Sequence, residues 1–133
     1  MKKNLLLLLL LVSAVTASAQ PYNNEWINYN QTYYKFKVGA TGVYRITQPT
    51  LATAGLGTTA AEHFQLWRNG RQVPLYTTVA TGTMTAGDYI EFWGEINDGR
   101  PDSALYRIRD HQLNDKWSLE TDTAVYFLTV NQT

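Results

Sequence analysis

Short runs in which apolar and polar residues alternate recur along most of this chain. Residues 33–38 place a tyrosine, a phenylalanine and a valine on one side and two lysines on the other, which is the period-two pattern of a half-buried strand. The pattern resumes at 43–46 after a stretch of turn-forming residues. We therefore expect these two strands to form a hairpin joined by the four-residue loop 39–42.

The clearest local signal lies at 64–76, where Asn69-Gly70 separates two strand-like runs. An Asn-Gly pair favours a two-residue type I′ turn, because both of its residues must adopt positive φ. Such a turn sets the register, and the expected opposed pairs are Arg68–Arg71, Leu66–Val73 and Phe64–Leu75. Pro74 has no backbone N–H to donate, so its strand is expected at a sheet edge or at a bulge.

The rest of the chain adds short strands and one helix. Strands are predicted at 88–93, at 104–108 and at 123–130, and the last of these is apolar on both faces, as in a central, buried strand. Residues 47–55 contain a threonine suited to capping, a proline suited to the first turn and a glycine suited to the end of a short helix. The whole pattern predicts an all-β fold, an antiparallel β-sandwich with at most one short helix.

The N-terminus has the three regions of a secretory signal peptide. Residues 1–4 carry two lysines, 5–12 are an unbroken apolar run and 17–19 are small, which is the order typical of a signal that is cleaved. The expected cleavage lies between Ala19 and Gln20. The apolar core is too short for a spanning helix, which needs about 20 apolar residues, and no cysteine follows it as a lipoprotein signal requires.

Removal of this signal, residues 1–19, leaves one predicted domain, residues 20–133, without a linker or an internal repeat. Lys2 and Lys3 leave with the signal, so 9 of the 11 basic residues remain against 11 acidic ones, and this slight acidity argues against nucleic acid as a partner. The 133 residues include no cysteine, which excludes disulfides, thiolate metal sites and a cysteine nucleophile. An exported domain of this kind has to fold by packing alone.

Few residues of the domain offer catalytic chemistry. The two histidines, His63 and His111, are too few for a histidine-based metal cluster unless carboxylates complete it. Its serines, Ser103 and Ser118, do not lie in a nucleophile elbow such as G-x-S-x-G. No Ser-His-Asp triad is therefore expected.

The densest acidic run contains Glu91, Glu95, Asp98 and Asp102. We interpret it as solvated, with two alternatives. A calcium loop would need the spacing D-x-[DN]-x-[DN]-G, which fails because Gly94 stands where an acid is required. A glycosidase pair would need Glu91 and a second acid across a cleft. No catalytic, cofactor-binding or metal-binding residue is assigned.

The surplus of aromatic residues permits one binding surface. Tyr89 and Trp93 fall on the same face of the predicted strand 88–93. Such a pair can form a platform on which a carbohydrate ring stacks, although core packing is the commoner fate of aromatic side chains. A free-standing, secreted carbohydrate-binding module is accordingly one hypothesis for the function.

Several short segments follow one another in a recognisable order. They are 24–29 (Asn-Glu-Trp-Ile-Asn-Tyr), 33–38 (Tyr-Tyr-Lys-Phe-Lys-Val), 42–46 (Gly-Val-Tyr-Arg-Ile), 67–70 (Trp-Arg-Asn-Gly), 87–95 (Gly-Asp-Tyr-Ile-Glu-Phe-Trp-Gly-Glu), 97–99 (Asn-Asp-Gly), 105–107 (Leu-Tyr-Arg) and 121–128 (Thr-Asp-Thr-Ala-Val-Tyr-Phe-Leu). Their order resembles the N-terminal region of gingipain-like cysteine peptidases of the type IX secretion pathway, including the sortase of that system. The resemblance covers residues 24–130, nearly the whole predicted domain.

This resemblance implies a non-catalytic role for the chain. In such proteins an N-terminal β-domain precedes a caspase-like peptidase domain that carries a His-Cys pair, and the sortase member is similar to a transpeptidase that joins secreted cargo to a surface lipopolysaccharide. None of those catalytic residues matches a position here, so the chain is expected to be the front piece of a longer precursor.

The same resemblance implies partners and a location. The first partner is the downstream peptidase domain of the same precursor, on which this domain would pack or which it would position. Further partners are outer-membrane components of type IX secretion. The implied location lies beyond the inner membrane, in the periplasm, at the outer-membrane surface or outside the cell.

Overall fold

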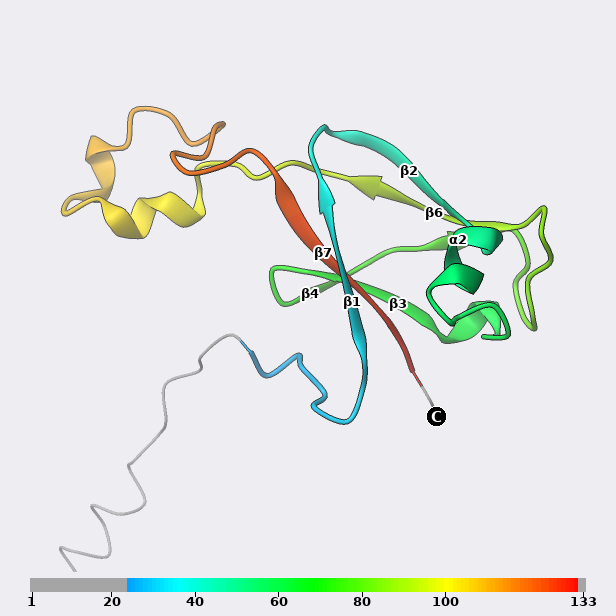
Figure 1. The fold of residues 1–133 in the computed structure, drawn as a ribbon. Helices are drawn as coiled ribbons and strands as arrows, with labels where there is room; N and C mark the ends of the chain where they lie inside the picture. The colour runs from blue at the N-terminus through cyan, green and yellow to red at the C-terminus, as the bar shows by residue number, and fades with distance from the viewer. Residues whose placement is uncertain (1–23, 132–133) are drawn as a thin grey trace, which may run out of the picture.

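The computed structural model describes residues 24–131, and these form two antiparallel sheets packed face to face (Figure 1). One sheet has four strands in the order β1-β7-β3-β4, and the other has three in the order β2-β6-β5. The predicted fold class, an all-β antiparallel β-sandwich with one short α-helix, is confirmed. The predicted cleavage site at Ala19 and Gln20 lies outside the described residues.

The described residues form seven strands and four short helical segments. The strands are β1 (Tyr33–Val38), β2 (Gly42–Thr47), β3 (Phe64–Arg68), β4 (Arg71–Val73), β5 (Tyr76–Thr77), β6 (Tyr89–Gly94) and β7 (Ala124–Val130). The helical segments are the α-helix α2 (Gln48–Thr53) and the 3₁₀ helices η1 (Ala61–His63), η2 (Pro101–Leu105) and η3 (Arg109–His111).

The predicted hairpin between 33–38 and 43–46 is wrong, because β1 and β2 belong to different sheets. β1 pairs with β7, whereas β2 pairs with β6. The reason lies in β7, which is apolar on both faces and therefore takes a central place between β1 and β3. The loop between β1 and β2 crosses to the other sheet, and the Tyr44 hydroxyl holds it by accepting a hydrogen bond from the Ala40 N–H (3.2 Å) and donating one to the Ala40 carbonyl (2.8 Å).

The predicted turn at Asn69-Gly70 is confirmed. Both residues have positive φ, 49° and 74°, and the pairs Arg68–Arg71 and Leu66–Val73 form as expected. The pair Phe64–Leu75 is wrong, since β4 ends at Val73 and Phe64 lies opposite Val130 of β7. Pro74 explains this early end, because it cannot donate to a ladder, and β4 does lie at a sheet edge.

Two further predictions have opposite outcomes. The helix expected within 47–55 is confirmed as α2, and it is followed by Gly55 with φ of 82°. The strand expected at 104–108 is wrong, because η2 covers its start and the remainder is irregular. This segment belongs to an excursion (residues 95–123) that leaves the sandwich between β6 and β7, yellow to orange in Figure 1. An alternating run with no neighbouring strand has no ladder to join.

The core between the two sheets is rich in aromatic rings. Phe36, Phe92 and Tyr126 pack against one another with ring centroids 5.5 to 5.8 Å apart, and Tyr44 stacks on Phe92 at 5.7 Å. Gly94 at the end of β6 suits this packing, because a Cβ there would lie 2.6 Å from the Tyr44 ring. The aromatic core therefore reaches the end of β6, where the candidate site lies.

The outer face of the four-stranded sheet has a smaller aromatic cluster of its own. Trp26, in the segment before β1, stacks on Trp67 at 5.5 Å and contacts Phe127 at the same distance between centroids. It also meets Tyr33 edge-on at 5.6 Å. The segment before β1 therefore covers part of this face.

Candidate binding groove beside Trp93

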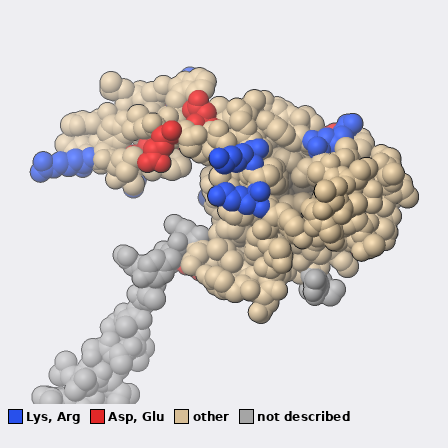
Figure 2. All heavy atoms as spheres, in the orientation of Figure 1, with Lys and Arg blue, Asp and Glu red and all other residues tan. Residues whose placement is uncertain are grey.

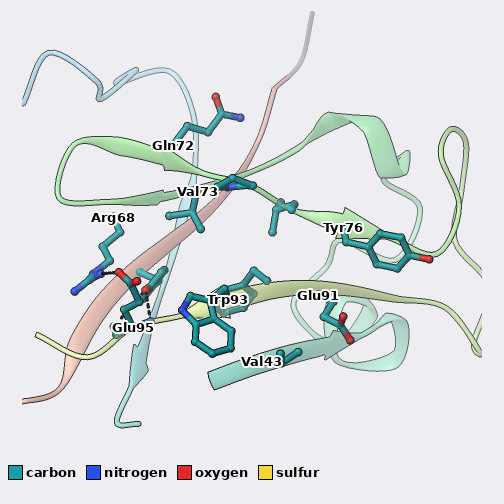
Figure 3. A pocket seen from close by; sticks show the side chains of 12 residues that line it. Val43, Arg68, Gln72, Val73, Tyr76, Glu91, Trp93 and Glu95 are labelled. Atoms are coloured by element: carbon teal, nitrogen blue, oxygen red, sulfur yellow. Dashed lines mark hydrogen bonds and ion pairs between the residues drawn. The ribbon is translucent and has the colours of Figure 1, made fainter. Parts of the chain in front are cut away.

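A groove of about 530 Å³ opens where the chain crosses from one sheet to the other. β4 is an edge strand of the four-stranded sheet and β5 of the three-stranded sheet, and the connecting residues Pro74 and Leu75 form one wall. β6 forms the other wall, with Trp93 in the middle of the view (Figure 3). The lining residues are Val43, Arg68, Gln72, Val73, Pro74, Leu75, Tyr76, Glu91, Phe92, Trp93, Glu95 and Tyr126. Small ligands are commonly bound in pockets of this size.

The groove joins the buried core to solvent. Phe92 and Tyr126, both buried, line its deep part. Trp93 is 56 % exposed, and Val43 and Tyr76 beside it are exposed as well. An apolar ligand group could therefore contact core rings and the Trp93 indole together.

One end of the groove is closed by a hydrogen-bonded polar cluster. Arg68 donates to Glu95 Oε2 at 3.0 Å and to the Ile96 carbonyl at 2.7 Å. The Tyr126 hydroxyl accepts a hydrogen bond from the Glu95 N–H (2.8 Å) and donates one to the Glu95 carbonyl (3.2 Å). The Arg68 side chain is mostly buried, and its Nε–H has no hydrogen-bond partner among the described residues. These contacts fix the chain just beyond β6.

The other end is occupied by an ion pair across β2 and β6. Arg45 donates to Glu91 Oε2 through Nε (3.2 Å) and Nη2 (2.8 Å), and this hydrogen bonding raises the pKa of Arg45. The guanidinium also lies 3.7 Å from the centroid of the Tyr89 ring. Strand register explains the pair, because Arg45 and Glu91 are directly opposed.

The two residues of the predicted carbohydrate platform have different surroundings. Tyr89 and Trp93 do share one face of β6, since they alternate with the buried Ile90 and Phe92. One side of the Tyr89 ring is covered by Arg45, whereas Trp93 stays exposed in the groove. We therefore expect a ligand ring to stack on Trp93 in preference to Tyr89.

The predicted acidic run is divided among separate local contacts. The partners are Arg45 for Glu91, Arg68 for Glu95, Arg100 for Asp98 and the Leu119 N–H for Asp102. Among residues 24–131 no group of three histidine, aspartate or glutamate side chains is placed to hold a metal ion. His63 and His111 lie in separate 3₁₀ helices, η1 and η3.

Sequence reasoning missed β5 and, with it, the groove. β5 pairs with β6 only through Tyr76–Glu91 and Thr77–Ile90, and two residues are too few to show an alternating pattern. Pro74 was the available signal, since it marks an edge. It does not show that the chain changes sheet immediately afterwards.

A second exposed surface lies on the excursion. Its exposed large apolar side chains are Leu105, Ile108, Leu113, Trp117 and Leu119. Leu113 is 98 % exposed. On the face seen in Figure 2, charged side chains are few and wide uncharged areas separate them. These five exposed apolar side chains all lie between residues 105 and 119, which makes this segment a candidate interaction surface.

Comparison with protein-family models, with curated proteins and with solved structures finds no match for this chain. Within residues 24–131, no helix is long and apolar enough to cross a membrane.

Proposed function

We propose that this chain is the non-catalytic N-terminal β-domain of an exported gingipain-like cysteine peptidase or type IX secretion sortase, and that it packs on and positions a downstream peptidase domain. The order in which the short sequence segments follow one another within residues 24–130 supports this family assignment. A β-sandwich is compatible with the β-domain expected in that place. The observation that carries the proposal is the exposed apolar surface of the excursion.

The excursion is longer than a connection between two strands requires, and it carries five exposed large apolar side chains. The excursion contains only two short 3₁₀ helices, and connections of more than about 15 residues with so little regular structure are uncommon in compact domains and are usually functional or linker segments. Fully burying an exposed leucine side chain contributes about 1.5–3 kcal/mol. A neighbouring domain that covered Leu113, which is 98 % exposed, would gain stabilisation of this order, and covering Trp117 and Leu119, which are 57 % and 66 % exposed, would add to it.

The excursion is also held in a defined shape. The Asn97 side-chain amide donates to the carbonyls of Thr121 (3.2 Å) and Thr123 (2.9 Å), which ties the two ends together. The carboxylate of Asp102, which is buried, accepts a hydrogen bond from the Leu119 N–H at 2.7 Å. A surface that is already ordered loses little conformational entropy when a partner binds.

In this proposal the two parts of the precursor have separate tasks. The downstream domain would supply the His-Cys pair and the peptide chemistry. This chain, which has no cysteine, would contribute binding energy and orientation. Its sandwich would act as the rigid support that presents the excursion to the neighbouring domain.

The first test is the native gene beyond codon 133. A reading frame that continues into a domain with the His and Cys motifs of a caspase-like peptidase is the expected result. A stop codon directly after codon 133 in the native gene would contradict the proposal.

The second test is hydrogen exchange in the longer chain. Amides of residues 105–119 are expected to exchange more slowly there than in the separate chain, and Leu113→Glu is expected to restore fast exchange. The matched control is Val43→Glu, another exposed aliphatic position but on the sandwich. Equal exchange of residues 105–119 in both chains would show that the excursion is not the contact surface.

A free-standing carbohydrate-binding module is the second candidate, favoured by the exposure of Trp93 in a groove. Titration with cellohexaose, chitohexaose and xylohexaose, followed by tryptophan fluorescence, tests it. Trp93→Ala is expected to abolish binding, whereas Trp117→Ala, an equally exposed tryptophan on the excursion, is expected to leave it unchanged. Equal losses in the two variants would contradict this candidate.

A further inference from the structure

The edge of β6 that faces the groove has one residue without a strand opposite it. The Gln48 N–H donates to the Asp88 carbonyl (2.9 Å). In this register the backbone N–H and carbonyl groups of the even-numbered residues of β6 face β2. The backbone N–H and carbonyl groups of the odd-numbered residues face the opposite edge, toward β5. The hydrogen bond from the Thr78 N–H to the Tyr89 carbonyl (3.2 Å) agrees with this. Trp93 is odd-numbered, and β5 does not extend far enough to pair with it.

Both neighbouring positions on this edge are already occupied. Glu91 pairs with Tyr76 of β5, and the backbone of Glu95 bonds a tyrosine hydroxyl through its N–H and its carbonyl. In the continued register Pro74 would lie opposite Trp93, but it has no N–H and the chain there has turned toward the other sheet. The gap on this edge is therefore one residue pair long.

We propose that the groove binds a short extended segment of another polypeptide, which pairs with the backbone of Trp93. An N–H and a carbonyl side by side on a strand edge are matched by the carbonyl and N–H of one extended residue. The groove shares only Glu95 with the excursion and none of the exposed apolar side chains of that segment, so the proposal does not depend on the domain-packing function.

The pleat of a strand specifies which side chains the segment needs. The residue opposite Trp93 lies on the outer face, next to the indole. Its two neighbours point inward, toward the apolar lining formed by Val73, Leu75 and Phe92. The bound segment is therefore expected to have an apolar residue on each side of a central residue whose side chain fits beside the Trp93 indole.

The charges around the indole favour a basic residue in the middle. Glu91 and Glu95 lie on either side of Trp93 (Figure 3), and Glu95 is 59 % exposed although Arg68 contacts it. A lysine opposite Trp93 can lie on the indole and direct its ammonium group toward one carboxylate. An acidic residue in the same place would gain no such contact, although Arg45 and Arg68 pair with the two carboxylates and reduce the difference.

The test uses the whole chain and the capped peptide acetyl-Thr-Val-Lys-Val-Thr-amide. The matched control is the same peptide with a methyl group on the backbone nitrogen of the lysine. This change removes one backbone N–H and keeps every side chain. One lost hydrogen bond corresponds to about a two- to twelvefold weaker affinity. NMR titration is expected to show this difference, and the parent peptide is expected to slow the exchange of the Trp93 backbone amide.

Variants of the protein separate the groove from other surfaces. Val73→Glu puts a charge in the wall and is expected to abolish binding, and Leu75→Ser is a milder change if the first variant does not fold. Leu113→Ser, on the excursion, is expected to leave the affinity unchanged.

Several results would overturn the proposal. These are equal binding of the methylated peptide, no change in Trp93 amide exchange at saturation, or protection of that amide at high protein concentration without peptide, which would indicate a second copy as the occupant. Binding of an oligosaccharide at Trp93 without competition from the peptide would do so as well.

Discussion

Replacing Gly94 with alanine adds one methyl group at the end of β6, against the aromatic core. A Cβ at this position would lie 2.6 Å and 2.8 Å from two atoms of the Tyr44 ring and 3.1 Å from Val38 Cγ1. Carbon atoms do not approach so closely, so the Tyr44 ring has to move. That ring stacks on Phe92 at 5.7 Å, and its hydroxyl makes two hydrogen bonds to Ala40.

The expected cost of Gly94→Ala follows from these contacts. Overpacking a core position costs about 1–3 kcal/mol, and displacing the Tyr44 hydroxyl removes hydrogen bonds worth about 1 kcal/mol each. Alanine also lowers the conformational entropy of the unfolded chain, which offsets about 0.4–1 kcal/mol of this cost. We expect a net loss of about 2–4.5 kcal/mol in the free energy of unfolding, or roughly 10–20 °C in Tm for a domain of this size.

Urea unfolding followed by tryptophan fluorescence measures this loss. Gly39→Ala is the matched control, because a Cβ there has no atom within 4 Å, and we expect it to change the free energy by less than about 0.5 kcal/mol. In a double-mutant cycle with Tyr44→Ala, most of the Gly94→Ala loss should disappear. Equal midpoints for the two glycine variants, or a loss independent of Tyr44, would refute the packing described here.

Three further predictions concern other parts of the molecule. Asp102→Ala removes the acceptor of the Leu119 N–H and is expected to loosen the excursion by about 1–3 kcal/mol, which faster amide exchange confined to the excursion would reveal. Leu113→Ser, at a side chain that is 98 % exposed, is expected to change the free energy of unfolding by less than about 0.5 kcal/mol in urea. The Thr85 N–H and hydroxyl, with a second threonine hydroxyl, lower the pKa of Asp88 below its ordinary 3.8, so its carboxylate stabilises the fold above that pH and this contribution is lost as the pH falls through the lowered value. Wild type should therefore be more stable than Asp88→Asn near neutral pH, and urea midpoints that stay equally far apart in strong acid would contradict this.

Several elements were predictable because their causes are local. The Asn69-Gly70 turn follows from the positive φ that both residues adopt, and this turn sets the register of β3 and β4. The helix within 47–55 and the alternating faces of β6 likewise depend on residues close in the chain. The central place of β7 was predictable for a different reason, since a strand apolar on both faces needs cover on both.

The partners of β1 were not predictable from its own residues. Its alternating pattern suits a hairpin with β2 as well as it suits a pair with β7. The choice depends on where the chain buries β7, far along the sequence. Residues 104–108 show the converse, because an alternating run remained irregular where no strand lies beside it.

The candidate site also combines a feature set by the local sequence with features set by the tertiary structure. Tyr89 and Trp93 are equivalent in the sequence, as aromatic residues on one face of one predicted strand. Only the tertiary structure brings Arg45 onto the Tyr89 ring, ends β4 before Pro74 and leaves the backbone of Trp93 without a strand opposite it. Turns and side-chain periodicity depend on neighbouring residues, whereas exposure and the choice of strand partner depend on segments that meet only after folding.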